Sequence, residues 1–228
     1  MMQYLIGLAA RWSALAVCAA GLALGVWPTG LRAQTAGLSV EPTLTADVRM
    51  RDGVHLATYV WLPRKGTKHP ALLIRSPYGL RYGPEKDTFK RYKFQAYVDH
   101  GYALVFQDTR GTGKSGGTFS LYLADGLDGY DSIEWIAKQP WSNGRVGTDG
   151  VSYLGTVQWL AARERPPHLR CIAPTAPSGE YFEELPYIGG AFRLEWALPY
   201  LSHVLNLDSE WLDWQSVFRY RPLNTADT

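Results

Sequence analysis

The chain has 228 residues, of which 46% are hydrophobic and 19% charged, a balance typical of a globular protein with one sizeable core. Its formal charge of +2 is spread without blocks of Lys or Arg, which argues against a nucleic-acid partner. Cys18 lies in an N-terminal apolar run, so Cys171 is alone in the rest of the chain and a disulfide framework is excluded. We interpret Cys171 as a small core hydrophobe in a buried strand.

The N-terminus has the pattern of a secretory signal peptide. Arg11 precedes an uncharged run rich in Ala and Leu over residues 12–27, and a helix-breaking stretch over 28–32 leads to Ala33. The run is shorter than the stretch of about 20 residues that spans a bilayer. We therefore expect residues 1–33 to be cleaved and the mature protein to be secreted or periplasmic, without stable membrane association. The alternative is an uncleaved anchor.

The first part of the mature chain predicts an antiparallel hairpin followed by parallel strands. Over residues 43–63, two stretches rich in β-branched and apolar residues flank the pair Asp52-Gly53, a strong hairpin signal. Residues 71–75 and 102–107 are short continuous apolar runs, which predict strands buried on both faces. The polar segment between them, to about residue 99, predicts a loop and a helix.

The next part continues the alternation of strand and helix. Residues 125–139 predict a crossover helix with acidic residues in its first turn. A very short strand near Val146 is expected to lead into a turn at Ser152 and a second helix, and residues 170–173 predict another strand. The pattern predicts an α/β fold with a doubly wound, mostly parallel sheet and an antiparallel N-terminal hairpin. After residue 176 the sequence is aromatic and helix-like without strands, which predicts the beginning of a cap.

Ser152 is the strongest candidate for a catalytic residue. The segment Gly150-Val151-Ser152-Tyr153-Leu154-Gly155 joins a predicted strand to a predicted helix, where α/β-hydrolases carry their nucleophile on a tight turn. Small residues permit that turn, and the first N–H groups of the helix face a developing oxyanion. The closing glycine comes three residues after Ser152 instead of the usual two. The alternative is that Ser152 is an ordinary helix N-cap.

A second serine, Ser115, matches the nucleophile pattern G-x-S-x-G formally. It lies in Gly113-Lys114-Ser115-Gly116-Gly117, a glycine-rich loop that does not run into a helix, so we interpret it as a decoy. The same Gly-Lys-Ser suggests a phosphate loop, but Asp108 stands where the first glycine of that motif belongs. We expect Asp108 and Arg110 to form a charged hydrogen-bonded pair that shapes this loop.

Tyr78 follows the strand predicted over residues 71–75, at the sheet edge where ligands of such folds bind. A phenol at that position can donate a hydrogen bond to an oxyanion. From position alone, an aromatic plug at the end of a strand is an equal alternative.

Five segments together carry a resemblance to a known family: VRMRDGVHLATYVWLP, LLIRSPYG, GYALVFQDTRGTGKSGG, DGYDSIEWIAKQPWSNGRVGTDGVSYLG and PHLRCIAPTAP. In order and spacing they resemble the X-Pro dipeptidyl-peptidase/cocaine esterase (CocE/NonD) family of α/β-hydrolases, over most of residues 45–182. The resemblance implies that Ser152 is the nucleophile in the family's own G-x-S-Y-x-G form. It also implies that the Tyr78 phenol and the Tyr153 backbone N–H form the oxyanion hole.

The family's triad Asp and His come after a helical cap, and we find neither in this chain. After Ser152 only His168 and His203 remain, and no Asp lies between Ser152 and His203. Glu195 and His203 fall in the aromatic segment, so they are a poor substitute for a triad pair. We expect residues 40–176 to be the N-terminal part of the hydrolase domain and residues 177–228 an incomplete cap. An incomplete record, a split enzyme completed by a second chain, and a non-catalytic binding homologue are the three explanations.

The expected activity is hydrolysis of an ester or amide through an acyl-enzyme, on a small-molecule or peptide substrate. A proline peptide, an amino-acid ester and a β-lactam are all compatible with the segments quoted. Glu183 and Glu184 are candidates for binding a substrate ammonium, although paired acids in a polar loop are more often only solvated. No His, Cys or carboxylate cluster has metal-ligand spacing, so we expect no metal and no organic cofactor.

Overall fold

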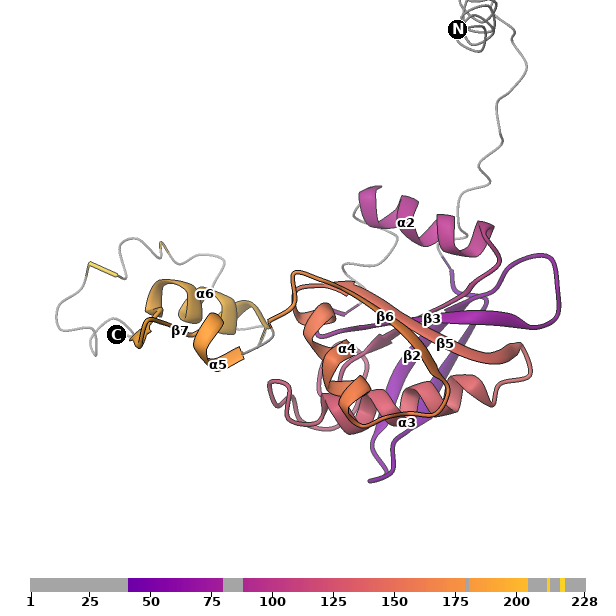
Figure 1. Ribbon diagram of the computed structural model, residues 1–228, viewed down its shortest axis with the longest axis horizontal. Coiled ribbons are helices and arrows are strands. Elements are labelled where there is room, and N and C mark those ends of the chain that lie inside the picture. The colour runs from indigo at the N-terminus through magenta and orange to yellow at the C-terminus, as the bar shows by residue number, and fades with distance from the viewer. Residues whose placement is uncertain (1–40, 80–87, 179–180, 205–212, 214–217, 220–228) are drawn as a thin grey trace, which may run out of the picture. The chain divides into compact units, whose positions relative to one another are not determined.

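The computed structural model describes residues 41–79, 88–178, 181–204, 213 and 218–219 (Figure 1). The predicted signal peptide, residues 1–33, lies outside the described residues. Within the described part, no helix combines the length and hydropathy that crossing a bilayer requires.

A six-stranded mixed sheet forms the centre of the fold. Its strands are β1 (Leu44–Arg49), β2 (His55–Trp61), β3 (His69–Ser76), β4 (Ala103–Asp108), β5 (Ser142–Val151) and β6 (Leu169–Thr175). They lie in the order β1-β2-β4-β3-β5-β6. The first two strands form the predicted antiparallel hairpin, and β4, β3, β5 and β6 are parallel to one another. This confirms the predicted α/β fold with an antiparallel N-terminal hairpin.

Three helices pack on the two faces of the sheet: α2 (Thr88–Asp99), α3 (Asp125–Ala137) and α4 (Tyr153–Arg163) (Figure 1). Every residue of β4 is buried, and its side chains alternate between two core clusters. Val105 packs with Ile133 of α3 and Ala161 of α4, whereas Phe106 packs with Phe94 of α2. Since neighbouring residues of a strand point to opposite faces, α2 covers one face while α3 and α4 cover the other.

The strand near Val146 is longer than expected, because β5 runs for ten residues. The sequence suggests an interruption there, since glycines weaken strands. Gly147 instead marks close packing: a Cβ at this position would lie 2.8 Å from Cys171 Sγ and 3.1 Å from Leu72 Cδ2. The interpretation of Cys171 as a buried residue is also wrong. Cys171 is exposed, because β6 pairs only with β5 and ends the described sheet.

After residue 176 the chain forms α5 (Tyr181–Glu184), β7 (Tyr187–Ile188), β8 (Ala191–Phe192) and α6 (Leu194–Val204). The prediction of a segment without strands is wrong, because β7 and β8 form a small antiparallel hairpin. Gly189 and Gly190 both have positive φ, of 57° and 82°, which a tight hairpin turn requires. The boundary between the hydrolase domain and the cap at residue 176 stays a prediction.

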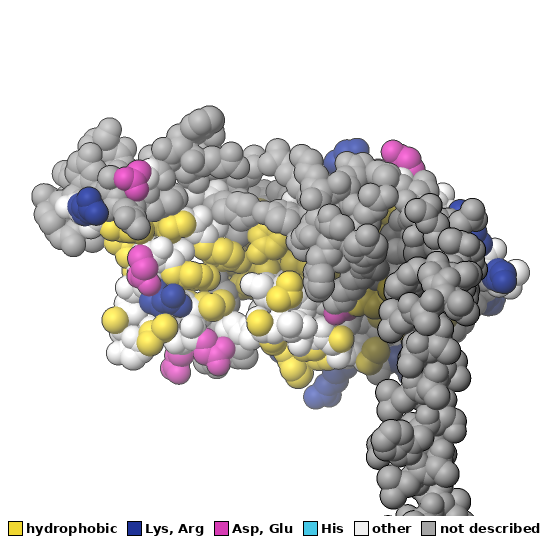
Figure 2. Space-filling model, turned by 90° about the horizontal axis from the view of Figure 1, so that it is seen from above, with side chains coloured by type: hydrophobic (Ala, Val, Ile, Leu, Met, Phe, Trp, Pro, Cys, Tyr) yellow, Lys and Arg dark blue, Asp and Glu magenta, His cyan; other side chains and the backbone are white. Residues whose placement is uncertain are grey.

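Hydrophobic side chains reach the surface in several places. Figure 2 shows them gathered over much of one face of the described part, with few charged side chains among them. Near the Ser152 turn, the exposed fractions of Val151 and Trp159 are 48% and 51%. Large apolar side chains exposed on neighbouring elements are typical of a surface that another polypeptide segment or a ligand covers.

Candidate active site

Ser152 forms the turn between β5 and α4. Its backbone has φ 58° and ψ −121°, a conformation that a residue with a Cβ rarely adopts and that costs on the order of 1–3 kcal/mol. The Ser152 N–H donates to the Thr175 carbonyl at 2.9 Å, and the Ser152 carbonyl accepts from the N–H groups of Gly155 and Thr156. The sharp bend predicted at this position is therefore present, and hydrogen bonds hold it on both sides.

The glycines on either side of Ser152 allow the bend. A Cβ at Gly150 would lie 2.4 Å from the Cβ of Leu154, so the strand end and the first helical turn pack too tightly for any side chain. A Cβ at Gly155 would lie 3.1 Å from the Thr175 oxygen and 3.3 Å from Pro177 Cβ. The closing glycine thus faces the end of β6, where an added side chain would be crowded.

The Ser152 side chain is exposed, and it makes no hydrogen bond to the N-terminus of α4. Ser152 occupies the N-cap position, but its hydroxyl does not cap the helix. This observation counts against the alternative that Ser152 is an ordinary N-cap. A strained, exposed hydroxyl at a helix start is instead the geometry of a nucleophile elbow.

Tyr78 lies beside this elbow. It follows β3, which pairs directly with β5, so the turns after the two strands are neighbours at one edge of the sheet. Its ring packs edge-on against the ring of Tyr153, with centroids 6.4 Å apart and planes at 68°. The Tyr78 N–H donates to the Ser76 hydroxyl at 3.2 Å, which fixes the start of the turn. The structure thus places Tyr78 in ring contact with Tyr153, the residue directly after Ser152.

Tyr153 is the first residue of α4, and its side chain is 1% exposed. Its backbone N–H has no acceptor within the helix, because the first N–H groups of any helix lack one. The phenol donates to Asp125 Oδ2 at 2.7 Å, and the ring stacks on Tyr122 with centroids 4.3 Å apart. Burial, with the nearby Asp125 carboxylate adding to it, raises the pKa of Tyr153 far above its usual value. The phenol is therefore a neutral hydrogen-bond donor.

A buried charged cluster lies beneath the elbow, and sequence reasoning missed it. Arg75 of β3 contacts Asp125 Oδ1 at 3.1 Å and lies 3.9 Å from Asp128 Oδ2. Arg110 forms a two-point ion pair with Asp128 and a third contact with Asp52 of the β1–β2 turn. The signal in the sequence was the acidic first turn of α3, which suggests only an interaction with the helix dipole.

The expected pairing of Asp108 with Arg110 is wrong. Arg110 turns toward Asp128 and Asp52, while Asp108 accepts a hydrogen bond from the Lys114 N–H at 3.0 Å. The reason is that the Asp108 carboxylate lies against Gly113 and fills the space of a side chain there. A Cβ at Gly113 would lie 2.2 Å from Asp108 Oδ2. Burial of Asp108 raises its pKa, and the hydrogen bond from Lys114 opposes that shift.

The Gly-Lys-Ser loop uses its serine for structure. The Ser115 hydroxyl donates to the Asp108 carbonyl at 2.7 Å and accepts from the Ala57 N–H at 2.9 Å. Both of its ordinary hydrogen-bonding roles are thus taken by the backbone of neighbouring strands. This arrangement agrees with the interpretation of Ser115 as a decoy.

Of the remaining candidates, Glu184 is linked to the first turn of α4 through Ser178, whose N–H donates to the Thr156 hydroxyl at 3.2 Å. Glu183 and Glu184 are both exposed on α5, and the Ser178 hydroxyl donates to Glu184 at 3.1 Å. His168 pairs with Glu134 at 2.8 Å just before β6, whereas Ser152 is bonded to the last residue of that strand. The seven residues of β6 separate the two positions by about 20 Å.

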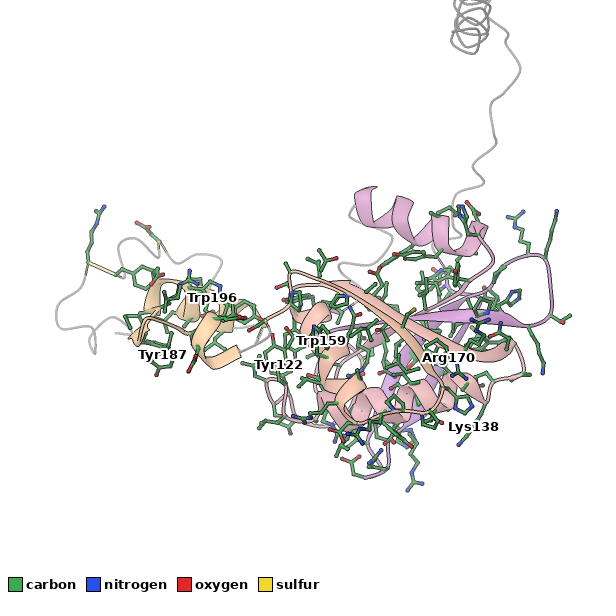
Figure 3. The ribbon with its side chains drawn as sticks, viewed as in Figure 1. Tyr122, Lys138, Trp159, Arg170, Tyr187 and Trp196 are labelled. Carbon is green, nitrogen blue, oxygen red and sulfur yellow. The ribbon has the colours of Figure 1, made fainter. Side chains whose placement is uncertain are left out.

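Figure 3 shows Tyr122, which stacks on Tyr153, at the opposite end of the sheet from Arg170 and Lys138. His168 therefore cannot reach Ser152. The side chain of His203, in α6, lies outside the described residues.

A serine elbow between a parallel strand and a helix, at the carboxyl edge of a mostly parallel sheet, defines the chain as part of an α/β-hydrolase fold. Comparison with known families identifies which one. Residues 52–215 match the X-Pro dipeptidyl-peptidase (S15 family), and the chain belongs to this family, which includes the CocE/NonD hydrolases.

The chain is similar to named esterases in sequence. The cocaine esterase of Rhodococcus sp. (strain MB1 Bresler) is 39% identical over 149 residues, which are 65% of this chain and 26% of the relative. A putative serine esterase of Mycobacterium bovis is 32% identical over 164 residues, 63% of this chain and 26% of the relative. The chain therefore spans about a quarter of the length of these relatives.

Two solved structures are similar in fold as well as in sequence. A CocE/NonD family hydrolase from Staphylococcus aureus has a TM-score of 0.62 at 28% identity, covering 72% of this chain and 32% of that one. An α-amino acid ester hydrolase has a TM-score of 0.61 at 27% identity, covering 75% and 32%. The predicted family membership is confirmed.

Proposed function

We propose that this chain carries the nucleophile and the oxyanion hole of a serine hydrolase that cleaves an ester or amide through an acyl-enzyme. The observation that carries the proposal is Ser152: its backbone is strained, its side chain is exposed, and its hydroxyl does not cap α4. Strain of this kind persists where the surrounding structure enforces it, and it is common at catalytic positions.

In the proposed reaction the Ser152 oxygen attacks the carbonyl carbon of the substrate and loses its proton to a base. The carbonyl oxygen becomes an oxyanion, which the Tyr78 phenol and the Tyr153 N–H stabilise by donating hydrogen bonds. Collapse of the intermediate expels the alcohol or amine with that proton, and water later attacks the acyl-enzyme. One oxyanion donor typically contributes about 10²–10³ in rate.

The base is not among the described residues. His168 is bound to Glu134 at the other end of the sheet, and a hydroxyl without a base loses most of its reactivity. The family resemblance implies an Asp and a His downstream of the cap. We expect them to come from a continuation of this polypeptide or from a complementing second chain.

The substrate class stays broad. The names of relatives include a cocaine esterase, an α-amino acid ester hydrolase and putative Xaa-Pro dipeptidyl-peptidases, and such substrates share a carbonyl next to a leaving alcohol or amine. Exposed carboxylates at Glu183 and Glu184 would suit a substrate with a free ammonium group. Reversing both charges with Glu183→Lys and Glu184→Lys should then reduce the preference of the active enzyme for amine-bearing esters. An unchanged preference would remove these residues from the substrate site.

A non-catalytic binding homologue is the second candidate, because no base pairs with the Ser152 hydroxyl among the described residues. A fluorophosphonate probe separates the two functions, because it reacts only with an activated serine. We expect the full-length product of the locus to be labelled and its Ser152→Ala variant not to be. Ser115→Ala serves as the control and should leave labelling intact. Absence of Ser152-dependent labelling in the full-length product would support the binding homologue.

Residues 1–33 support secretion or a periplasmic location as a further part of the proposal. Cell fractionation combined with sequencing of the mature N-terminus tests it. The expected result is an exported protein that begins at Gln34. An N-terminus that still carries residues 1–33 would indicate an uncleaved anchor or a protein that is not exported.

A further inference from the structure

Two parts of the proposed oxyanion hole come from different elements of the fold. Tyr78 follows β3, and Tyr153 begins α4. Oxyanion donors act only when their positions relative to the nucleophile are fixed before the reaction. The structure therefore needs a contact that ties the end of β3 to the start of α4.

We infer that Asp125 is this tie: a positioning residue that fixes both donors of the oxyanion hole through Tyr153 and Arg75. This inference rests on the proposed function of Ser152, Tyr78 and Tyr153. Asp125 does not touch the reacting atoms, so it acts through the residues that it binds.

On one side, Asp125 holds the start of α4. Its Oδ2 accepts the Tyr153 phenol at 2.7 Å, and Tyr153 is the residue directly after Ser152. The Tyr153 ring is also stacked on Tyr122, whose backbone has a positive φ of 62°. Two strained residues, Ser152 and Tyr122, thus adjoin the same buried ring. Because such strain is costly, the bond that anchors the Tyr153 ring to Asp125 helps to hold both residues in their strained conformations.

On the other side, Asp125 holds the end of β3. Its Oδ1 lies 3.1 Å from Arg75 Nη1, and the same nitrogen donates to the Asp125 backbone carbonyl at 2.8 Å. Arg75 adds a bond to Gln107 on the neighbouring β4 at 3.0 Å, so its guanidinium is fixed from two sides. Arg75 is three residues before Tyr78. The two oxygens of one carboxylate therefore bind the two elements that carry the donors.

The charge and burial of this carboxylate make the arrangement rigid. Asp125 and Arg75 are each 4% exposed. Removing one partner of a buried ion pair strongly destabilises a protein, because the other charge is left buried without compensation. Burial raises the pKa of Asp125, whereas the Arg75 guanidinium opposes that shift. A neutral Asn at this position accepts a weaker hydrogen bond from Tyr153 than the carboxylate does, and it cannot balance the charge of Arg75.

The test compares Tyr153→Phe, Asp125→Asn and the double variant by residue-resolved amide hydrogen exchange on the full chain. Tyr153→Phe keeps the ring and the backbone N–H. It removes the hydrogen bond to Asp125 and the long one, of 3.5 Å, that the hydroxyl accepts from the Tyr122 N–H. The informative amides are Ser152, Gly155 and Thr156, which make the hydrogen bonds that hold the bend. We expect protection of these amides to fall about tenfold or more in each single variant. In the double variant, the loss of protection should be smaller than the product of the two single losses, because the two residues are partners in one bond.

The molecule offers a matched control on the opposite side of β5. Tyr97 of α2 donates its phenol to Asp149 at 2.5 Å, and Asp149 is 6% exposed. Tyr97→Phe removes a phenol-to-carboxylate bond of the same type without touching Tyr153. It should lower global stability to a similar degree. Protection at Ser152, Gly155 and Thr156 should then fall only as much as the loss of global stability accounts for. If the three amides respond alike to Tyr97→Phe and Tyr153→Phe, Asp125 is not a positioning residue.

A second readout separates this inference from the proposed function. In the full-length product, the rate of fluorophosphonate labelling at Ser152 should fall about tenfold or more in Tyr153→Phe and Asp125→Asn, and stay unchanged in Tyr97→Phe. If the unmodified protein is not labelled while the exchange result holds, the proposed function fails and Asp125 is only an anchor of the Ser152 bend. If the protein is labelled at the same rate in all variants, the positioning role fails and the proposed function stands.

Discussion

Gly150 and Leu154 approach each other so closely that a Cβ at Gly150 would lie 2.4 Å from the Cβ of Leu154. The two residues stand on either side of Ser152, at the end of β5 and in the first turn of α4. Their contact sets how sharply the chain bends, and the bend lifts the Ser152 hydroxyl to the surface. The packing of two residues that take no part in chemistry therefore defines where the nucleophile lies.

Gly150→Ala should accordingly destabilise the protein and disturb the elbow. The added methyl group both meets Leu154 and requires an alanine at a φ of 153°, so we expect a loss of about 1–3 kcal/mol from overpacking in addition to the backbone strain. Chemical denaturation measures the loss. Gly101→Ala is the matched control, because Gly101 has a φ of 88° and nothing within 4 Å of its Cβ position. Equal losses in both variants would mean that the contact with Leu154 is unimportant.

Ser152→Gly should make the protein more stable while removing the proposed nucleophile. Glycine adopts the conformation of residue 152 without steric cost, so relief of the strain should raise the free energy of unfolding by about 1 kcal/mol. Ser152→Ala keeps the Cβ and the strain, and its stability should stay close to that of the unmodified protein. A glycine variant that is no more stable than the alanine variant would show that the backbone at Ser152 is not strained.

The sheet and the elbow could be predicted from the sequence because their signals are local. Asp52-Gly53 predicts the hairpin, continuous apolar runs predict the buried parallel strands, and glycines around Ser152 predict the sharp turn. Each of these features depends on residues within a few positions of one another, so one sequence is sufficient to recognise them.

The charged cluster beneath the elbow could not be predicted, because its partners are far apart in the chain. Arg75 and Asp125 are 50 residues apart, and Arg110 and Asp128 are 18 apart. In the sequence Asp108 is the nearest acid to Arg110, which suggests a local pair. Parallel strands joined by helices instead bring the first turn of α3 beside both arginines. Register and crossover geometry decide such pairs, and local patterns do not reveal them.

Ser115→Ala tests the structural role of the second serine pattern. Its hydroxyl bridges the Asp108 carbonyl and the Ala57 N–H, so its removal leaves a partly buried N–H of β2 without that partner. We expect the free energy of unfolding to fall by about 1–3 kcal/mol, as measured by denaturation. Unchanged stability would contradict the bridging role.

Tyr59→Phe should remove a pH dependence of stability at high pH. Burial, reinforced by the Asp108 carboxylate, raises the pKa of Tyr59 to about 12 from its ordinary value of 10. A raised pKa means that the folded protein keeps this proton more tightly than the unfolded chain does. The stability linked to the proton is complete below pH 10 and is lost as the pH rises from 10 through 12.

Denaturation of both proteins at intervals between pH 9 and pH 12 measures this dependence. At pH 9 Tyr59→Phe should differ from the unmodified protein by a constant amount, from the lost contact between the Tyr59 hydroxyl and Asp108 at 3.4 Å. Above pH 10 the unmodified protein should lose stability more steeply than the phenylalanine variant, because only the unmodified protein releases the Tyr59 proton on unfolding. Other buried tyrosines such as Tyr153 are present in both proteins, so their titration cancels in the difference. A difference that stays constant up to pH 12 would mean that Tyr59 titrates normally and that Asp108 does not influence it.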